Sequence, residues 1–246
     1  MTVDPQGAIS AQLPTATLDA LLGYAARATW PAGFVIYQRG APADGIFVVE
    51  EGRVVLRSRV RAGRGFIPWI ATPNETFGAE GLSATPKYST EARADEETTT
   101  VFLSGSRFRA FVREQPQHAT LLIAQVLSER SALLDKLREF TTMSVEQRLT
   151  IALVRLGTFA SFTRDDGSIV LDTGRYRLLC ELVGATRESV SLVLGRLAGE
   201  GLIERKGSSL VIHPARLAHR LDEAAPLDDL LAASGGGSLG TSAVAL

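Results

Sequence analysis

A change in hydrophobic period near residue 115 constrains the fold of this chain more than any other feature of its sequence. Before residue 115, short runs of β-branched and aromatic residues are separated by glycine and polar residues, as in β-sandwiches and barrels. After it, apolar residues recur every three or four positions, which is the period of a helix. The 246 residues are enough for two modest cores. We therefore predict an α+β protein with a β-rich first half and a helical second half.

The β-rich half, residues 1–114, is predicted to form a β-roll of the jelly-roll type. A short helix is expected at residues 18–26, and strands are expected at residues 33–37, 45–49, 52–56, 66–70 and 98–103. Five glycines are expected at turns that need a positive φ, and they are Gly40, Gly45, Gly52, Gly78 and Gly81.

Residues 115–142 are predicted to form one long helix with a single apolar seam. The seam consists of Ile123, Val126, Leu127, Leu133, Leu134, Leu137, Phe140 and Thr141. Such a seam could pack on the β-roll, but its length and narrowness favour a coiled coil between two copies of the chain. We therefore interpret this segment as a dimerisation helix.

Residues 143–222 are predicted to form a winged helix-turn-helix domain. A hinge at Met143 and Ser144 precedes a helix over residues 145–159, and a polar loop with a short strand follows within residues 160–172. Later in the domain, two strands on either side of Lys206-Gly207 are expected to form the wing. A tail of small residues, 223–246, is expected to be disordered.

The helix-turn-helix is predicted from two short amphipathic helices with a turn between them. Gly184 permits a sharp turn, and Thr186 can cap the second helix by accepting a backbone N–H bond. The apolar faces consist of Leu179, Leu182 and Val183 in the first helix and Val190, Val193, Leu194 and Leu197 in the second.

The other face of the second helix carries candidate base-reading residues, Arg187, Glu188, Ser191 and Leu192. Near the N-terminus of such a helix, Arg187 can bind guanine through two hydrogen bonds and Glu188 can accept from cytosine N4. Leu192 can contact a thymine methyl group. Ser189 and the helix end capped by Thr186 are placed for phosphate. The alternative for Arg187 and Glu188 is an ordinary exposed pair.

The charge distribution is uneven along the chain. Between Thr173 and Arg220, eight basic residues stand against four acidic ones, so this stretch carries +4 and leaves −5 for the rest of a chain with net charge −1. A basic module on an acidic body suits binding to the phosphate backbone of DNA, and Arg205 and Lys206 in the wing are expected near phosphates. The charge alone is equally compatible with a solvated helix face.

Residues 20–220 resemble the cyclic AMP receptor / fumarate-nitrate regulator (CRP/FNR) family of bacterial transcription factors. The resemblance rests on the order of the parts, on Phe77-Gly78-Ala79-Glu80-Gly81-Leu82 after a strand, and on Val183-Gly-Ala-Thr-Arg-Glu-Ser-Val. It implies a homodimer on double-stranded DNA, with two recognition helices in successive major grooves of a pseudo-palindromic operator. It also implies an effector in the β-roll that shifts the pose of the DNA-binding domains, and RNA polymerase as a partner.

The effector site that the resemblance implies departs from the family pattern. Its positions in this chain are Gly78, Ala79, Glu80, Tyr88, Ser89, Leu133 and Leu134. Cyclic AMP receptors hold the ribose with a Glu where this chain has Ala79, and they clamp the phosphate with an Arg-Ser pair where it has Tyr88-Ser89. Their adenine-contacting Thr-Ser pair corresponds to Leu133-Leu134. Because the phosphate loses its guanidinium partner, we expect that cyclic AMP is not the effector.

Glu80 is one residue out of register with the ribose-binding acid of the family, which makes it only a weak candidate for a re-purposed contact. In the recognition helix, Leu192 stands where the family often has an Arg. The operator is therefore expected to differ from the common half-site of the family.

The cysteine and the histidines argue against the other sensor chemistries of the family. An iron–sulfur cluster needs four cysteine ligands, whereas this chain has only Cys180, in an apolar helical pattern that favours a core role over redox sensing. Haem needs an axial His or Cys, and His118, His213 and His219 lie outside the β-roll. No cofactor is predicted, and a different small molecule or no ligand at all both remain open.

Two other classes of protein share part of this outline. A cupin-type enzyme would need a His-rich metal site in its barrel, which the sequence lacks, so we predict no enzyme activity. A regulatory subunit that acts through protein contacts would leave Arg187 and Glu188 without a role. Because the sequence has neither an apolar run of about 20 residues nor a signal peptide, we expect a cytoplasmic protein without membrane contacts.

Overall fold

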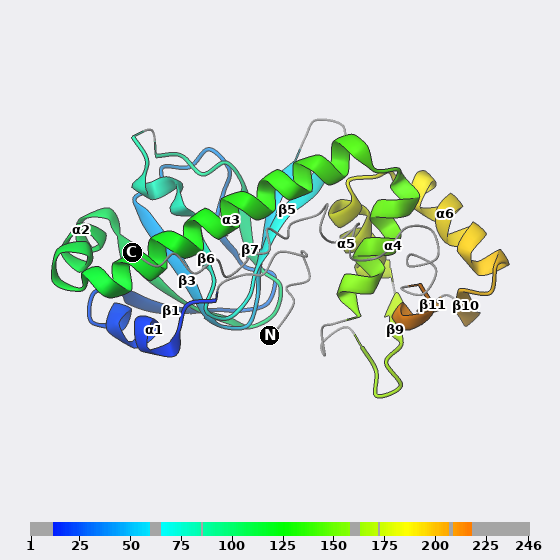
Figure 1. Ribbon diagram of the computed structural model, residues 1–246, viewed down its shortest axis with the longest axis horizontal. Coiled ribbons are helices and arrows are strands. Elements are labelled where there is room, and N and C mark those ends of the chain that lie inside the picture. The colour runs from blue at the N-terminus through cyan, green and yellow to red at the C-terminus, as the bar shows by residue number, and fades with distance from the viewer. Residues whose placement is uncertain are drawn as a thin grey trace, which may run out of the picture.

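The computed structural model of the protein describes residues 12–59, 65–84, 86–157, 163–171, 173–206 and 209–217. A β-roll is followed by one long helix and by a smaller domain, and the two domains lie toward opposite ends of the long axis (Figure 1). None of the helices in these ranges is long and apolar enough to cross a membrane. The tail predicted at residues 223–246 lies outside the described residues.

The β-roll consists of two antiparallel four-stranded sheets, with strand orders β1-β8-β3-β6 and β2-β7-β4-β5. The strands are β1 Ala26–Trp30, β2 Val35–Tyr37, β3 Gly45–Glu51, β4 Val54–Arg59, β5 Gly65–Ala71, β6 Thr76–Phe77, β7 Glu91–Ala94 and β8 Thr98–Ser104. A short 3₁₀ helix, η1 (Ala79–Leu82), follows β6. Side chains from both sheets fill the space between them, and the largest are Tyr37, Phe47, Trp69, Phe77 and Tyr88.

Three helices cover the outer face of the first sheet. They are α1 (Thr15–Leu22), α2 (Gly105–Glu114) and the first part of α3 (Pro116–Thr142). Along β3, Phe47 and Val49 point between the sheets, whereas Ile46 and Val48 pack under these helices. Burial on both faces explains why the β3 sequence is an unbroken apolar run.

Among the described residues, the smaller domain has the helices α4, α5 and α6 and a three-stranded sheet with order β10-β11-β9. Its elements are α4 Val145–Leu156, β9 Ile169–Leu171, α5 Thr173–Val183, α6 Arg187–Gly199, β10 Ile203–Lys206 and β11 Ser209–Ile212. The break before α4 has a capping box, in which the Ser144 side chain accepts from Gln147 N and the Gln147 side chain accepts from Ser144 N. This confirms the break that the sequence predicts at Met143 and Ser144.

One buried cluster contains residues of both domains. Val55 of β4 and Ile67 and Ile70 of β5 belong to the same buried cluster as Leu149 of α4 and Leu179 of α5. Because successive strand residues face opposite ways, β4 and β5 present one face to the interior of the roll and the other to the smaller domain. At the edge of this contact, Arg57 Nε lies 3.1 Å from Glu181 Oε2.

The glycine prediction was right for three positions and wrong for two. Gly40, Gly52 and Gly78 have φ values of 82°, 81° and 70°. Gly45 and Gly81 do not have positive φ, since Gly45 lies in β3 and Gly81 in η1. A Cβ on Gly81 would lie 2.2 Å from the backbone N of Gly45, so these two glycines permit two backbone segments to touch.

Several predicted boundaries were also wrong. The first helix ends at Leu22 instead of residue 26, because Ala26 begins β1, which pairs with the distant β8. The helix predicted to end at residue 159 ends at Leu156, and residues 158–162 are not among those described. The strand in the loop before α5 is confined to Ile169–Leu171. Helix α2 and the short or polar strands β6 and β7 were not predicted at all.

Candidate DNA-binding surface and effector cavity

Helix α6 is held by its N-terminal cap and by its buried face. Gly184 has a φ of +63° in the turn before it. The Thr186 hydroxyl accepts from Ser189 N at 3.3 Å, as the capping prediction requires. The apolar residues of the predicted face are all buried, and they are Val190, Val193, Leu194 and Leu197.

The opposite face of α6 is open to solvent. Arg187, Glu188 and Ser191 are exposed, and Leu192 is 72% exposed, the highest value among the exposed large hydrophobic side chains of the described residues. Ser189 is partly buried. A leucine this exposed has no packing role in the monomer, so an apolar contact with another molecule would account for it.

The two charged residues at the start of α6 are oriented by local contacts. The Arg187 guanidinium lies over the Tyr176 ring at 5.8 Å, and the Tyr176 hydroxyl donates to Arg187 O at 3.0 Å. The backbone N–H of Glu188 and the Thr186 side chain hold the pKa of the Glu188 carboxyl below its usual range. The Glu188 side chain is therefore charged at neutral pH and stands at the positive end of the helix dipole.

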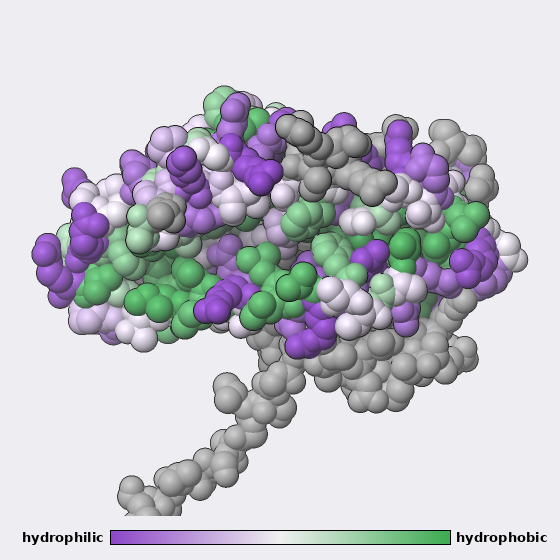
Figure 2. Space-filling view, turned by 90° about the horizontal axis from the view of Figure 1, so that it is seen from above, coloured by the Kyte–Doolittle hydropathy of each residue, from purple (hydrophilic) through white to green (hydrophobic). Residues whose placement is uncertain are grey.

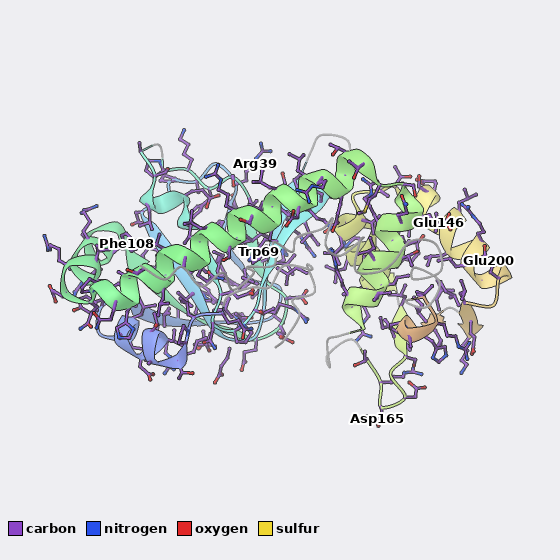
Figure 3. The ribbon with its side chains drawn as sticks, in the orientation of Figure 1. Arg39, Trp69, Phe108, Glu146, Asp165 and Glu200 are labelled. Carbon is purple, nitrogen blue, oxygen red and sulfur yellow. The ribbon has the colours of Figure 1, made fainter. Side chains whose placement is uncertain are left out.

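The wing is formed by β10 and β11, which pair from Ile203 with Ile212 to Lys206 with Ser209. Lys206 is exposed at the end of the hairpin. Arg205 is placed within β10 by its backbone, opposite Leu210. Helix α6 is also tied to α4, because Arg196 Nη1 lies 2.8 Å from Oε2 of Glu146, which Figure 3 labels on α4.

A cavity of about 430 Å³ lies between β4, β5, η1 and α3 in the β-roll. Its lining includes four of the residues predicted for the effector site, Ala79, Glu80, Ser89 and Leu133. The other lining residues are Leu56, Ser58, Phe66, Pro68, Trp69, Thr90, Val126, Glu129 and Arg130. Figure 3 places Trp69 under the middle of α3.

The three remaining predicted effector residues do not line this cavity. Tyr88 is buried and stacks on Tyr37, with ring centroids 3.6 Å apart and planes within 7°. Leu134 is 56% exposed on α3. Gly78 packs between Tyr37, Phe47 and Tyr88, where a Cβ would lie 3.2 to 3.3 Å from all three rings. Tyr88 and Gly78 therefore belong to the aromatic core of the roll.

Carboxylates dominate the polar end of the cavity. Glu80 accepts a hydrogen bond from Ser89 N at 3.1 Å and a second from the Ser89 hydroxyl. Glu129 accepts from the Thr76 hydroxyl at 3.5 Å. Burial, together with the nearby carboxylates Glu80 and Glu75, raises the pKa of Glu129 to about 8.

Two family patterns match the chain, one over the domain that contains the cavity and one over the domain that contains α6. Residues 27–115 match the cyclic nucleotide-binding domain, and residues 147–220 match the Crp-like helix-turn-helix domain. The chain belongs to the CRP/FNR family of transcription regulators. The helix-turn-helix match contains α5, α6 and the wing, so the surface described above lies on the DNA-binding domain of this family.

Curated members of the family cover most of the chain. The CRP-like cAMP-activated global transcriptional regulator of Mycobacterium tuberculosis is 24% identical over 193 residues, which are 78% of this chain and 86% of the relative. The cyclic AMP receptor protein of Thermus thermophilus is 28% identical over 203 residues, 81% of this chain and 89% of the relative. The family resemblance stated from the sequence is thereby confirmed.

Solved structures of two bacterial regulators share the fold. The c-di-GMP responsive global regulator CLP of Xanthomonas campestris superposes with a TM-score of 0.72 at 19% identity, over 81% of this chain and 99% of that one. A CRP/FNR transcriptional regulator from Thermus thermophilus superposes with a TM-score of 0.66 at 23% identity, over 79% and 98% of the two chains.

Several lining residues of the cavity were not predicted from the sequence, above all Glu129. This residue lies one helical turn before Leu133 and therefore on the same face of α3. An acidic residue at that spacing from an expected effector position was a usable signal. The raised pKa of Glu129 depends on burial and on Glu80 and Glu75, which are distant along the chain, so no local sequence pattern predicts it.

Proposed function

We propose that this protein binds double-stranded DNA sequence-specifically and regulates transcription as a homodimer on a pseudo-palindromic operator. The observation that carries the proposal is the open face of α6, where exposed Arg187, Glu188, Ser191 and Leu192 surround a capped helix N-terminus. A helix of this kind enters the major groove with its N-terminal residues at the base edges.

The proposed roles follow from the chemistry of each side chain. Arg187 donates two hydrogen bonds to a guanine, Glu188 accepts from cytosine N4, and Leu192 meets a thymine methyl group. Thr186, Ser189 and the free N–H groups of the helix end contact phosphate. Lys206, with Arg205 in the same strand, approaches the phosphates from the wing.

A row of exposed apolar residues on α3 supports the dimer. Figure 2, which looks down on this side of the molecule, shows hydrophobic side chains gathered in a row along its length. The exposed members of this row on α3 are Ile123 45%, Leu127 55%, Leu134 56% and Leu137 58%. Leu127 and Leu134 are one heptad apart, and Ile123 and Leu137 are two heptads apart, so a second α3 would cover them in a coiled coil.

The second part of the proposal concerns the effector, which we place in the β-roll cavity and expect not to be cyclic AMP. Ala79 offers no carboxylate to a ribose, and Tyr88 is buried against Tyr37 instead of lining the cavity. Leu133 offers no hydrogen bond to a base. Such a regulator would act in the cytoplasm, with RNA polymerase as its protein partner.

A titration of the protein with cyclic AMP tests the effector proposal. We expect no calorimetric signal at micromolar concentrations and no change in operator affinity. Micromolar binding of cyclic AMP coupled to tighter operator binding would contradict it.

Selection of bound fragments from a genomic DNA library tests the main proposal. We expect enrichment of one pseudo-palindromic sequence, with an affinity that falls steeply as salt concentration rises, because phosphate contacts release counterions. Failure to enrich any sequence at low salt would contradict DNA binding by this chain.

A further inference from the structure

The cavity in the β-roll has an acidic end and an apolar body. The acidic end is formed by Glu80 of η1 and Glu129 of α3, which both line the cavity. Behind them lies Glu75, which is 1% exposed. The body is formed by aliphatic and aromatic side chains, Leu56, Phe66, Pro68, Trp69, Val126 and Leu133.

Among the described residues, Glu129 has no ion pair with a cationic side chain. The donor that reaches it is the Thr76 hydroxyl, at the long distance of 3.5 Å. Burial raises the pKa of Glu129, and the carboxylates of Glu80 and Glu75 add to that effect. A partly buried carboxyl among other carboxyls is an unfavourable arrangement that a bound cation would relieve.

Trp69 supplies a second feature that the fold does not explain. Its side chain is 1% exposed and lines the cavity, yet its Nε1 has no hydrogen-bond partner among the described residues. Buried indole N–H groups normally find an acceptor. Whatever the state of its Nε1, the Trp69 ring gives the cavity an aromatic wall against which an apolar or aromatic ligand body can pack.

Arg130 is the cation among the lining residues, and it does not reverse the sign of the site. It is exposed in the single chain, and it stands against two lining carboxylates, Glu80 and Glu129. The charge inside the cavity is therefore set by the carboxylates.

We propose that the effector of this protein is an organic cation, with a protonated amine between Glu80 and Glu129 and an apolar or aromatic body against Trp69. This inference rests on the proposed function, because it takes the β-roll cavity as the effector site. It adds the chemical class of the ligand, which is opposite in charge to a cyclic nucleotide.

Calorimetry with pairs of probes that differ only in charge tests the proposal. The full chain is titrated without DNA with tryptamine and phenethylamine, and with their carboxylate counterparts indole-3-propionate and 3-phenylpropionate. We expect each amine to bind at least about tenfold more tightly than its counterpart, because the amine meets carboxylates where the carboxylate is repelled.

The proton balance of binding gives an independent readout. With a pKa near 8, Glu129 is mostly protonated at pH 7, and a bound cation would displace that proton. The other titratable or charged groups around Glu129 are Glu75, Glu80, Tyr37 and Arg130. Titrations in two buffers of different ionisation enthalpy should show release of nearly one proton per amine bound.

Glu129→Gln and Glu97→Gln form a matched pair of variants, since Glu97 is an exposed carboxylate in the turn before β8. We expect Glu129→Gln to weaken amine binding about tenfold and to abolish proton release, and Glu97→Gln to change neither. Equal or tighter binding of the carboxylates, no binding of either class at millimolar concentration, or unchanged binding in Glu129→Gln would overturn the proposal. The DNA selection is carried out without ligand. A protein that enriches DNA but fails to prefer amines overturns only the effector proposal, and a protein that enriches no DNA overturns the DNA-binding proposal.

Discussion

At the scale of single residues, the Arg187 side chain is exposed to solvent and is also oriented by Tyr176. Its side chain is exposed, while the Tyr176 ring at 5.8 Å and the bond from the Tyr176 hydroxyl to Arg187 O limit the directions it can take. A guanidinium held in this way loses less conformational entropy when it binds a base edge. This is the physical reason to expect that Arg187 reads one position of the operator.

Replacing Arg187 with Ala should relax specificity at that one operator position, with a loss of about 1 to 3 kcal/mol on the preferred sequence. Competition binding with operator variants measures it. Lys206→Ala is the control, since a phosphate contact weakens binding about equally on all sequences and lowers the salt slope by about 1. Uniform weakening by Arg187→Ala would show that Arg187 contacts phosphate instead.

The raised pKa of Glu129 predicts how the stability of the protein depends on pH. Its pKa is about 8 in the folded protein and lower in the unfolded chain, so the folded state binds more protons between these two values. Stability is therefore highest below the unfolded pKa and falls as the pH rises toward and through 8. Thermal unfolding should show Glu129→Gln gaining stability over the parent protein more at pH 8.5 than at pH 5.5.

The control for this prediction is again Glu97→Gln, an exposed carboxylate. Its difference from the parent protein should be small and should change little with pH. If Glu129→Gln lost the same stability at both pH values, the carboxylate would be a structural hydrogen-bond acceptor rather than a buried group under strain.

At the scale of elements, the turn of the helix-turn-helix also holds the long helix. Gly184 has a φ of +63°, and a Cβ there would lie 3.1 Å from Cζ of Phe140 near the end of α3. Phe140 in turn lies edge-on to Phe66 of β5, at 5.9 Å, and Lys136 and Arg148 lie over its ring. The turn before the recognition helix is therefore in contact with the hinge between the domains.

Gly184→Ala should destabilise the protein by about 1 to 2 kcal/mol or more, because it adds left-handed backbone strain and a close contact with Phe140. Gly195→Ala is the matched variant within α6, where nothing lies within 4 Å of the added Cβ. It should stabilise the helix by about 0.5 to 1 kcal/mol. Urea unfolding measures both, and equal effects of the two variants would contradict this account.

At the scale of the whole molecule, the hairpin of β4 and β5 belongs to both halves. Leu56 and Trp69 line the cavity in the β-roll, whereas Val55 and Ile70 of the same strands are buried with the smaller domain. Arg57 and Glu181 make an ion pair across the same boundary. A ligand that moves this hairpin would thus move the surface on which α5 rests, and α5 leads directly into the turn before α6.

The dimer prediction also belongs to this scale. Leu134→Lys or Leu127→Lys should weaken self-association by about 2 kcal/mol or more, roughly thirtyfold in the dissociation constant, because each places a charge in an apolar coiled-coil seam. Sedimentation or light scattering measures the mass. Leu192→Lys is the control, since Leu192 is more exposed still but lies on α6. A dimer that survives both α3 substitutions would place the interface elsewhere.

The sequence by itself determined the order of the domains, the extent of α3 and the helix-turn-helix with its cap. These features depend on hydrophobic period and on local turn chemistry, and both act between residues a few positions apart. Thr186 and Gly184 have the roles predicted for them because a cap and a turn need only their immediate neighbours. For the same reason Cys180 was correctly placed in the core.

Only the tertiary structure decided what each site contains. Burial and the nearby Glu80 and Glu75 raise the pKa of Glu129, Tyr88 becomes a core residue through Tyr37, and Gly81 is required by the backbone of Gly45. The shared core likewise joins β4 and β5 to helices that come much later in the chain. Burial, charge repulsion and steric fit act between groups that are near in space, and a pattern read along the chain does not contain those distances.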